Sequence, residues 1–135
     1  DPYLSRGLGD VYKRQNSHDL FKRSDENLFF ECPISITDAA LGSSIEIPTI
    51  DGGRAKIKIP AGTQSGKQFR LKGKGMPYMR GSGVGDLYVQ VNTEVPISLN
   101  KEQKELLEKF REIENDKSNP SIKQFFNKAK NFWSN

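Results

Sequence analysis

Apolar and polar residues alternate along several short stretches in the first two thirds of the chain. Over residues 28–36, Leu28, Phe30, Cys32 and Ile34 fall on one face of an extended strand, because successive side chains point to opposite sides. Shorter runs of the same period occupy residues 44–48, 54–59, 68–72 and 86–95. This pattern predicts a mainly β domain, a small sandwich or barrel of five or six short strands.

Glycine, proline and small polar residues separate these runs. Asp51-Gly52-Gly53 is typical of a tight hairpin turn between two strands. Residues 37–42 predict one helical turn, with Thr37 or Asp38 as its N-cap and Gly42 at its end. Pro33 lacks the backbone N–H that a central strand requires, which indicates an edge or a bulge.

The period changes to that of a helix at Asn100. Asn100 and Gln103 have the spacing of a capping box, and Asn119-Pro120 opens a second helix. Both predicted helices carry an apolar stripe, formed by Leu106, Leu107, Phe110 and Ile113 in the first and by Ile122, Phe125, Phe126, Ala129, Phe132 and Trp133 in the second. These stripes need a surface to cover, and the pattern leaves open whether it is the chain's own β-domain or a second subunit.

The first fifteen residues fit neither period. Residues 10–15 can be back-translated into a transposon-end sequencing adapter, and our hypothesis is that residues 1–15 are a disordered, non-native cloning scar without a role in the fold. The domain organisation we expect is therefore a β-domain over residues 16–99 and a helical tail over residues 100–135.

Composition and charge narrow the function only a little. Lysine and arginine exceed aspartate and glutamate by 21 to 17, a mild excess that does not demand nucleic acid. The single cysteine, Cys32, excludes a disulfide within the chain and favours a reducing, cytoplasmic location. No apolar run approaches the roughly 20 residues that cross a bilayer, and no signal peptide is recognisable.

The sequence contains no convincing motif for catalysis or for cofactor binding. Residues 62–68 approach a phosphate-binding loop, but the spacing is one residue short and Gln68 stands where a Ser or Thr is required. One histidine, His18, and one cysteine cannot assemble a His/Cys zinc site. No nucleophile–base arrangement is recognisable either, so we expect a protein that is not an enzyme and binds no cofactor in this part.

Several short motifs match one family in order and spacing. The chain from His18 to about Ile113 resembles the second C-terminal substrate-binding domain of DnaJ-type co-chaperones, the J-proteins that serve DnaK-type chaperones. The matching segments are His18–Arg23, Ala39–Gly42, Ile47–Gly52, Ile59–Gln64, Arg70–Gly75, Gly85–Leu87 and Pro96–Leu107. The J-domain, the Gly/Phe linker, the Cys-rich zinc repeats and the first substrate-binding domain are not in this sequence. The resemblance therefore implies a C-terminal fragment, with zinc bound only in the Cys-rich part of the full-length protein.

The resemblance also implies a function in protein folding and the stress response. In the family, a sibling domain holds unfolded clients in a shallow apolar groove beside an exposed strand, and the C-terminal helices form a homodimer. Carried onto matching positions here, the client-binding residues would be Phe30, Cys32, Ile45, Ile47 and Phe69. The dimerisation residues would be Leu106, Leu107, Phe110, Phe125 and Phe126. The expected partners are unfolded polypeptides, a second copy of the chain and, through the full-length protein, a DnaK-type chaperone, without a membrane.

Two other functions remain open at this stage. Lys67, Arg70, Lys72, Lys74 and Arg80 could make the domain a basic β-barrel that binds single-stranded nucleic acid, with Tyr78 and Tyr88 as the only obvious aromatic side chains for stacking. The chain could also be a pure scaffold, if only the sibling domain of the longer protein binds clients.

Overall fold

The computed structural model describes residues 20–79 and 81–134. The chain divides into two compact units, Asp1–Pro96 and Ile97–Asn135. The first unit is a β-domain and the second holds two helices. Residues 1–15 and His18 lie outside the described residues, so the hypothesis about the first segment stays a prediction.

Within the described residues the first unit has six short strands and one short helix, which confirms the predicted fold class. The elements are β1 (Lys22–Ser24), β2 (Asn27–Ser35), α1 (Ile36–Leu41), β3 (Ser43–Pro48), β4 (Arg54–Ile59), β5 (Gln68–Leu71) and β6 (Leu87–Glu94). Strand β1 was not predicted, because its three polar residues are all exposed and offer no apolar position to mark a strand.

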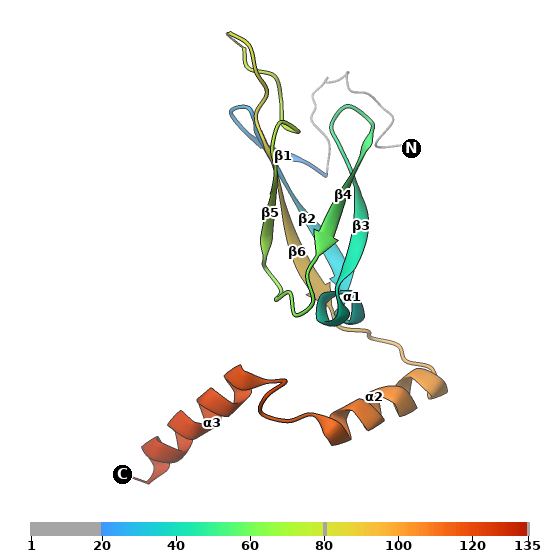
Figure 1. The fold of residues 1–135 in the computed structure, drawn as a ribbon, viewed down its shortest axis with the longest axis vertical. Coiled ribbons are helices and arrows are strands. Elements are labelled where there is room, and N and C mark those ends of the chain that lie inside the picture. Colours follow the sequence, from blue (N-terminus) through green and yellow to red (C-terminus); the bar gives the residue numbers. More distant parts are fainter. Residues whose placement is uncertain (1–19, 80, 135) are drawn as a thin grey trace. The chain divides into compact units, whose positions relative to one another are not determined.

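The strands form two sheets. Figure 1 shows β2 and β6 side by side at the centre of a four-stranded sheet of order β1-β2-β6-β5, and β3 and β4 as a separate hairpin. The central pair β2 and β6 is parallel, with a register that runs from Leu28 opposite Leu87 to Ser35 opposite Glu94. All other pairs are antiparallel.

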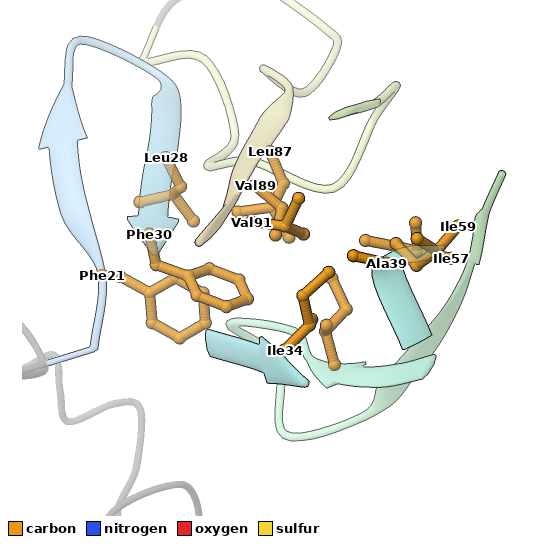
Figure 2. Packing of buried hydrophobic residues seen from close by; sticks show 11 residues of the cluster. Phe21, Leu28, Phe30, Ile34, Ala39, Ile57, Ile59, Leu87, Val89 and Val91 are labelled. Carbon is orange, nitrogen blue, oxygen red and sulfur yellow. The ribbon is translucent and has the colours of Figure 1, made fainter. Parts of the chain in front are cut away.

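One hydrophobic core lies between the two sheets (Figure 2). The alternating residues of β6, Leu87, Val89 and Val91, are completely buried, as a central strand requires. The buried side chains that complete the core come from β2, α1, β3, β4 and the segment before β1, and they are Leu28, Phe30, Ile34, Ala39, Ile47, Ile57, Ile59 and Phe21. The arrangement is the predicted small β-sandwich.

Helix α1 makes one sharp turn between β2 and β3. Its N-cap is Ser35, whose hydroxyl accepts a hydrogen bond from the Asp38 N–H at 3.0 Å, so the prediction of Thr37 or Asp38 as the cap is wrong. Ser35 is the last residue of β2 and already has the extended backbone that a cap needs. The predicted end at Gly42 is confirmed, and its φ of 87° explains the glycine.

The hairpin turn between β3 and β4 is held by Asp51. Its Oδ1 accepts hydrogen bonds from the Thr49 hydroxyl at 2.5 Å and from the Gly53 N–H at 2.9 Å. These bonds, that from Thr49 foremost, lower the pKa of Asp51. The turn predicted at residues 51–53 is therefore confirmed, and Thr49 is buried with its hydroxyl satisfied.

A second aspartate, Asp86, connects the start of β6 with β5 and with the start of β2. Its Oδ2 accepts a hydrogen bond from Arg70 Nε at 2.7 Å, and its Oδ1 accepts one from the Gly73 N–H at 2.9 Å. Its own N–H donates to Asn27 Oδ1 at 2.9 Å. The Gly73 N–H and the Arg70 guanidinium lower the pKa of Asp86. The carboxylate thus fixes the start of β6 against β5 and the turn after it, and the backbone N–H of Asp86 fixes it against Asn27.

The second unit consists of α2 (Lys101–Ile113) and α3 (Pro120–Trp133). The capping box predicted for α2 is present: Asn100 Oδ1 accepts from the Gln103 N–H at 2.8 Å, and Gln103 Oε1 accepts from the Asn100 N–H at 3.0 Å. Pro120 opens α3, as predicted.

Candidate functional site

The five residues predicted to bind clients lie in or against the core of the β-domain. Phe30 and Ile47 are core residues, exposed by only 7% and 2%. Cys32, Ile45 and Phe69 are half-buried and pack against the same core from its border. These five are called the client-site residues below. Only the three at the border present apolar surface to a ligand without movement of the core.

Two of the client-site residues share one row across the four-stranded sheet. Phe69 on β5 is opposite Val89 on β6, and Val89 is opposite Phe30 on β2. Since neighbouring strands are about 4.8 Å apart, Phe30 and Phe69 lie roughly 10 Å from each other with Val89 between them. Phe30 also makes an edge-to-face contact with Phe21, with ring centroids 5.3 Å apart.

The outer edge of β2 is open beyond Phe29. Strand β1 pairs only with Asn27–Phe29, and no other described residue pairs with that edge. Leu28 donates its N–H to Asp86 O on the β6 side, so by alternation Glu31 and Pro33 turn their backbone groups toward the open edge. The edge position indicated for Pro33 is therefore confirmed. A proline is tolerated here because its nitrogen faces the open edge, where β2 has no partner strand that would need an N–H donor.

Cys32 lies along this open edge with its side chain on the inner face. Its thiol is 3.7 Å from the carbonyl oxygen of Pro33, and partial burial raises its pKa. A raised pKa keeps the thiol neutral, so Cys32 acts as a small apolar side chain rather than as a nucleophile.

The hairpin supplies the opposite wall and a second open edge. Ile45 is opposite Ile57 and Ile47 is opposite Ala55, so these four apolar side chains share one face of the two-stranded sheet. Within the described residues β3 pairs only with β4, which leaves its other edge unpaired. An extended segment could therefore add backbone hydrogen bonds to β3 and insert apolar side chains beside Ile45.

The predicted dimerisation residues lie on the second unit and are largely uncovered. In α2, Leu106 and Phe110 are exposed and Leu107 is half-buried. In α3, Phe125 and Phe126 are exposed by 64% and 54%, and their rings meet edge to face at 5.2 Å. Ile113, Ile122, Phe132 and Trp133 extend the two stripes and are exposed as well. Neither helix contains a buried residue.

One aromatic residue on the outer face of the four-stranded sheet, Phe29, was not among the predicted site residues. Phe29 is half-buried there and stacks on Tyr88 of β6, with ring centroids 5.0 Å apart and an angle of 13° between the planes. The alternation of side chains along the strand could have identified it. Because Leu28 and Phe30 face the core, Phe29 between them must place a large apolar ring on the solvent side.

Of the basic residues considered for nucleic-acid binding, Arg70 has an acidic partner within the chain. Arg70 is engaged by Asp86, which raises the pKa of the guanidinium. Tyr88 is covered on one ring face by Phe29. The segments before and after β5 contain Lys67, Lys72 and Lys74. Arg80 lies outside the described residues.

The described part of the chain offers no metal centre. No group of three or more His, Cys, Asp or Glu side chains in residues 20–79 and 81–134 is placed to hold a metal ion. In the same ranges, no helix has both the length and the apolar composition to cross a membrane.

Two family models match the chain. A model described as the DnaJ C terminal domain matches residues 7–96, and one described as the Chaperone protein DnaJ C-terminal region matches residues 102–135. Together they account for both units, and the boundary between them falls in the segment between β6 and α2.

Three relatives, each described as Chaperone protein DnaJ, illustrate the similarity. The protein of Pelagibacter ubique (strain HTCC1062) is 85% identical over 129 residues, which cover 94% of this chain and 34% of the relative. That of Ruegeria sp. (strain TM1040) is 49% identical, covering 86% of this chain and 30% of the relative. That of Cereibacter sphaeroides (strain ATCC 17029 / ATH 2.4.9) is 50% identical, and the match covers 93% of this chain and 33% of the relative.

The chain thus spans about a third of the length of the curated relatives it matches. The first family model alone covers more than half of the chain, and it covers all six strands of the β-domain. The chain belongs to the DnaJ C-terminal domain family, which is a family of chaperones and not of enzymes.

Proposed function

We propose that this chain is the client-binding and dimerising part of a DnaJ-type co-chaperone. The β-domain binds unfolded polypeptide through the client-site residues, and the helical unit joins two copies. The observation that carries the proposal is the open edge of β3 beside the half-buried Ile45, which lies in the same apolar layer as Cys32. Backbone pairing along a strand edge gives affinity without a strong choice of sequence, which suits unfolded clients.

The site is suited to weak binding. Phe30 and Ile47 form its floor as part of the core, so only Cys32, Ile45 and Phe69 offer contact area at the surface. Partly exposed apolar side chains beside an unpaired edge give shallow contacts, and weak contacts allow a client to be released.

The test is the affinity of the full chain for a permanently unfolded protein, reduced and carboxymethylated α-lactalbumin, measured by fluorescence anisotropy. Ile45→Asp should weaken binding by about tenfold, because a charge enters the apolar layer where the client side chain inserts. The matched control is Ser44→Asp, one residue earlier on the exposed outer face of β3. Equal affinities of the two variants, with both folded by circular dichroism, would contradict the proposal.

We infer that the helical unit provides dimerisation. The apolar stripes of α2 and α3 contain Leu106, Phe110, Phe125 and Phe126, and none of these is buried within the chain. Exposed apolar stripes of this kind are buried by association. Two client sites on one dimer make the second contact with a client intramolecular, so two weak sites hold one unfolded chain through avidity.

Light scattering of the full chain tests the assembly. The double variant Phe125→Ser/Phe126→Ser should convert a dimer into a monomer, whereas Lys123→Ser/Lys128→Ser, on the same helix, should leave the dimer intact. A monomeric unmodified chain would refute dimerisation by this part. A dimer that survives in both variants would place the interface on Leu106, Leu107 and Phe110 instead.

Delivery of clients to a DnaK-type chaperone would depend on parts of the longer protein. We infer that this chain contributes client affinity and valency to that process. No cofactor is required for either contribution, and zinc would be bound only by the Cys-rich region of a full-length relative.

A further inference from the structure

The outer face of the four-stranded sheet carries an aromatic row flanked by two cations. The strand registers place Lys22 opposite Phe29, Phe29 opposite Tyr88, and Tyr88 opposite Arg70. Phe29 and Tyr88 stack with nearly parallel rings, and both are half-buried. A stacked aromatic pair is unusual on the face of a sheet that does not adjoin the core.

A trough runs beside this row. Its volume is about 460 Å³, and its lining residues are Leu20, Lys22, Phe29, Phe30, Glu31, Gln68, Tyr88 and Gln90. Glu31, Gln90 and Gln68 form the next row of the sheet, one on each of β2, β6 and β5. From Lys22 on β1 to Gln68 on β5 the trough crosses three strand spacings, roughly 14 Å, which matches about four residues of extended polypeptide.

The trough adjoins the proposed client site at β2. Phe30 is a core residue and one of the client-site residues, yet it also lines the trough. Strand β1 pairs with β2 only as far as Phe29, so no strand of the described residues covers the edge of β2 at this point. A polypeptide that occupies the inner site can thus continue past the open edge of β2 onto the outer face.

We propose that the trough binds a second stretch of the same unfolded polypeptide in extended conformation. An apolar side chain of the client rests against Phe29 and Tyr88, and the Gln68 amide bonds its backbone. Gln90, whose Nε2 already donates to Asn92 Oδ1 at 3.1 Å, adds its amide oxygen as a further acceptor. This proposal rests on the proposed function, since it extends the client's path from the inner face of β2 to the outer face.

The chemistry of the trough favours a peptide of variable sequence. The Gln68 amide makes no hydrogen bond within the part of the chain that the structure describes, so it can both donate to and accept from a peptide unit. Lys22 and Glu31 supply one charge of each sign, so neither an acidic nor a basic client is excluded. Aromatic rings add apolar contact area at little cost in side-chain entropy.

The same geometry does not suit a nucleic acid. Nucleobases bind by stacking on a free aromatic face. Here the facing sides of Phe29 and Tyr88 are taken up by each other, and their outer sides face the flanking Lys22 and Arg70 positions in the row. What the pair presents to a ligand is the ring edges, which form an apolar wall for aliphatic or aromatic side chains.

The test compares a long and a short client on the full chain. Phe29→Thr/Tyr88→Thr keeps residues that favour strands and removes both rings. Its affinity for reduced, carboxymethylated α-lactalbumin should fall by about tenfold or more, as expected when one of two linked contacts is lost. Its affinity for a labelled apolar tetrapeptide, which is about as long as the trough and cannot fill both sites, should remain within about twofold. Lys58→Thr, on the exposed outer face of β4, is the control.

The outcomes separate this inference from the proposed function. If the unmodified chain binds no unfolded protein, both fall. If it binds, and the ring variant is folded and binds equally well, the trough is not a client site and the inference alone is overturned. If the unmodified chain instead binds a labelled single-stranded oligonucleotide, and the ring variant does not, the trough is a nucleic-acid site and the inference is again overturned.

Discussion

Arg70 donates a hydrogen bond from Nε to Asp86 Oδ2 at 2.7 Å, across the antiparallel pair β5 and β6. The Asp86 side chain is only 14% exposed, and it also accepts the Gly73 N–H. Asp86→Asn keeps the shape and removes the charge, so we expect a lower Tm through weaker bonds to both donors. Thermal unfolding followed by circular dichroism measures this. Glu94→Asn, at the exposed end of β6, should leave Tm unchanged.

Acid should destabilise the β-domain through Asp86 and Asp51. Both have a pKa below that of the unfolded chain, because their charged forms accept hydrogen bonds in the folded state. Their contribution is therefore complete above the unfolded pKa of about 3.9 and is lost as the pH falls through the lower folded pKa. Urea unfolding between pH 6 and pH 2 should show this fall. In Asp86→Asn the fall should be shallower, and an unchanged pH profile would contradict the assignment.

Gly85 should tolerate no side chain. A Cβ at this position would lie 2.1 Å from the carbonyl oxygen of Glu26, a backbone atom that cannot move freely. Gly85→Ala should therefore lower the free energy of unfolding by about 3 kcal/mol. The comparison is Gly81→Ala, where the Cβ meets open space and only a φ of 77° opposes it. That variant should lose about 1 kcal/mol, and equal losses in urea unfolding would show that the contact with Glu26 is not decisive.

The capping box of α2 should decide how stable that helix is. Asn100→Ala removes the side-chain acceptor of the Gln103 N–H and should cost about 1 kcal/mol of helix stability. Hydrogen exchange of the first-turn amides in α2 should become faster by about fivefold. Lys101→Ala, the adjacent residue without a capping bond, should change these rates little.

The strands of the β-domain were predictable where one face is core. Leu87, Val89 and Val91 alternate with polar residues over a whole strand, and all three are completely buried. The N-cap of α1 could not be predicted in the same way, because the side chains of Ser35, Thr37 and Asp38 can all accept a hydrogen bond from a backbone N–H. The choice depends on where β2 ends, and the extended backbone of Ser35 is set by its pairing with Glu94. That pairing is not visible in the local pattern.

The client-site residues show the same limit. Parity along β2 places Phe30 and Cys32 on one face, but it does not show that Phe30 is core and Cys32 only half-buried. The difference depends on the neighbouring elements, and β1 was not predicted at all. Phe29 was missed for a related reason: its partner Tyr88 is 59 residues away in sequence, and only the parallel register brings the two rings together.

Pro33 limits how well an added polypeptide strand can pair with the open edge of β2. It lies on the open edge, where its ring nitrogen cannot donate to an incoming strand. A second strand that pairs along this edge meets a missing hydrogen bond at Pro33, which disfavours growth of a continuous intermolecular sheet. If the β-domain binds unfolded chains as proposed, this gap would hinder those chains from extending a sheet along β2 and would favour their release.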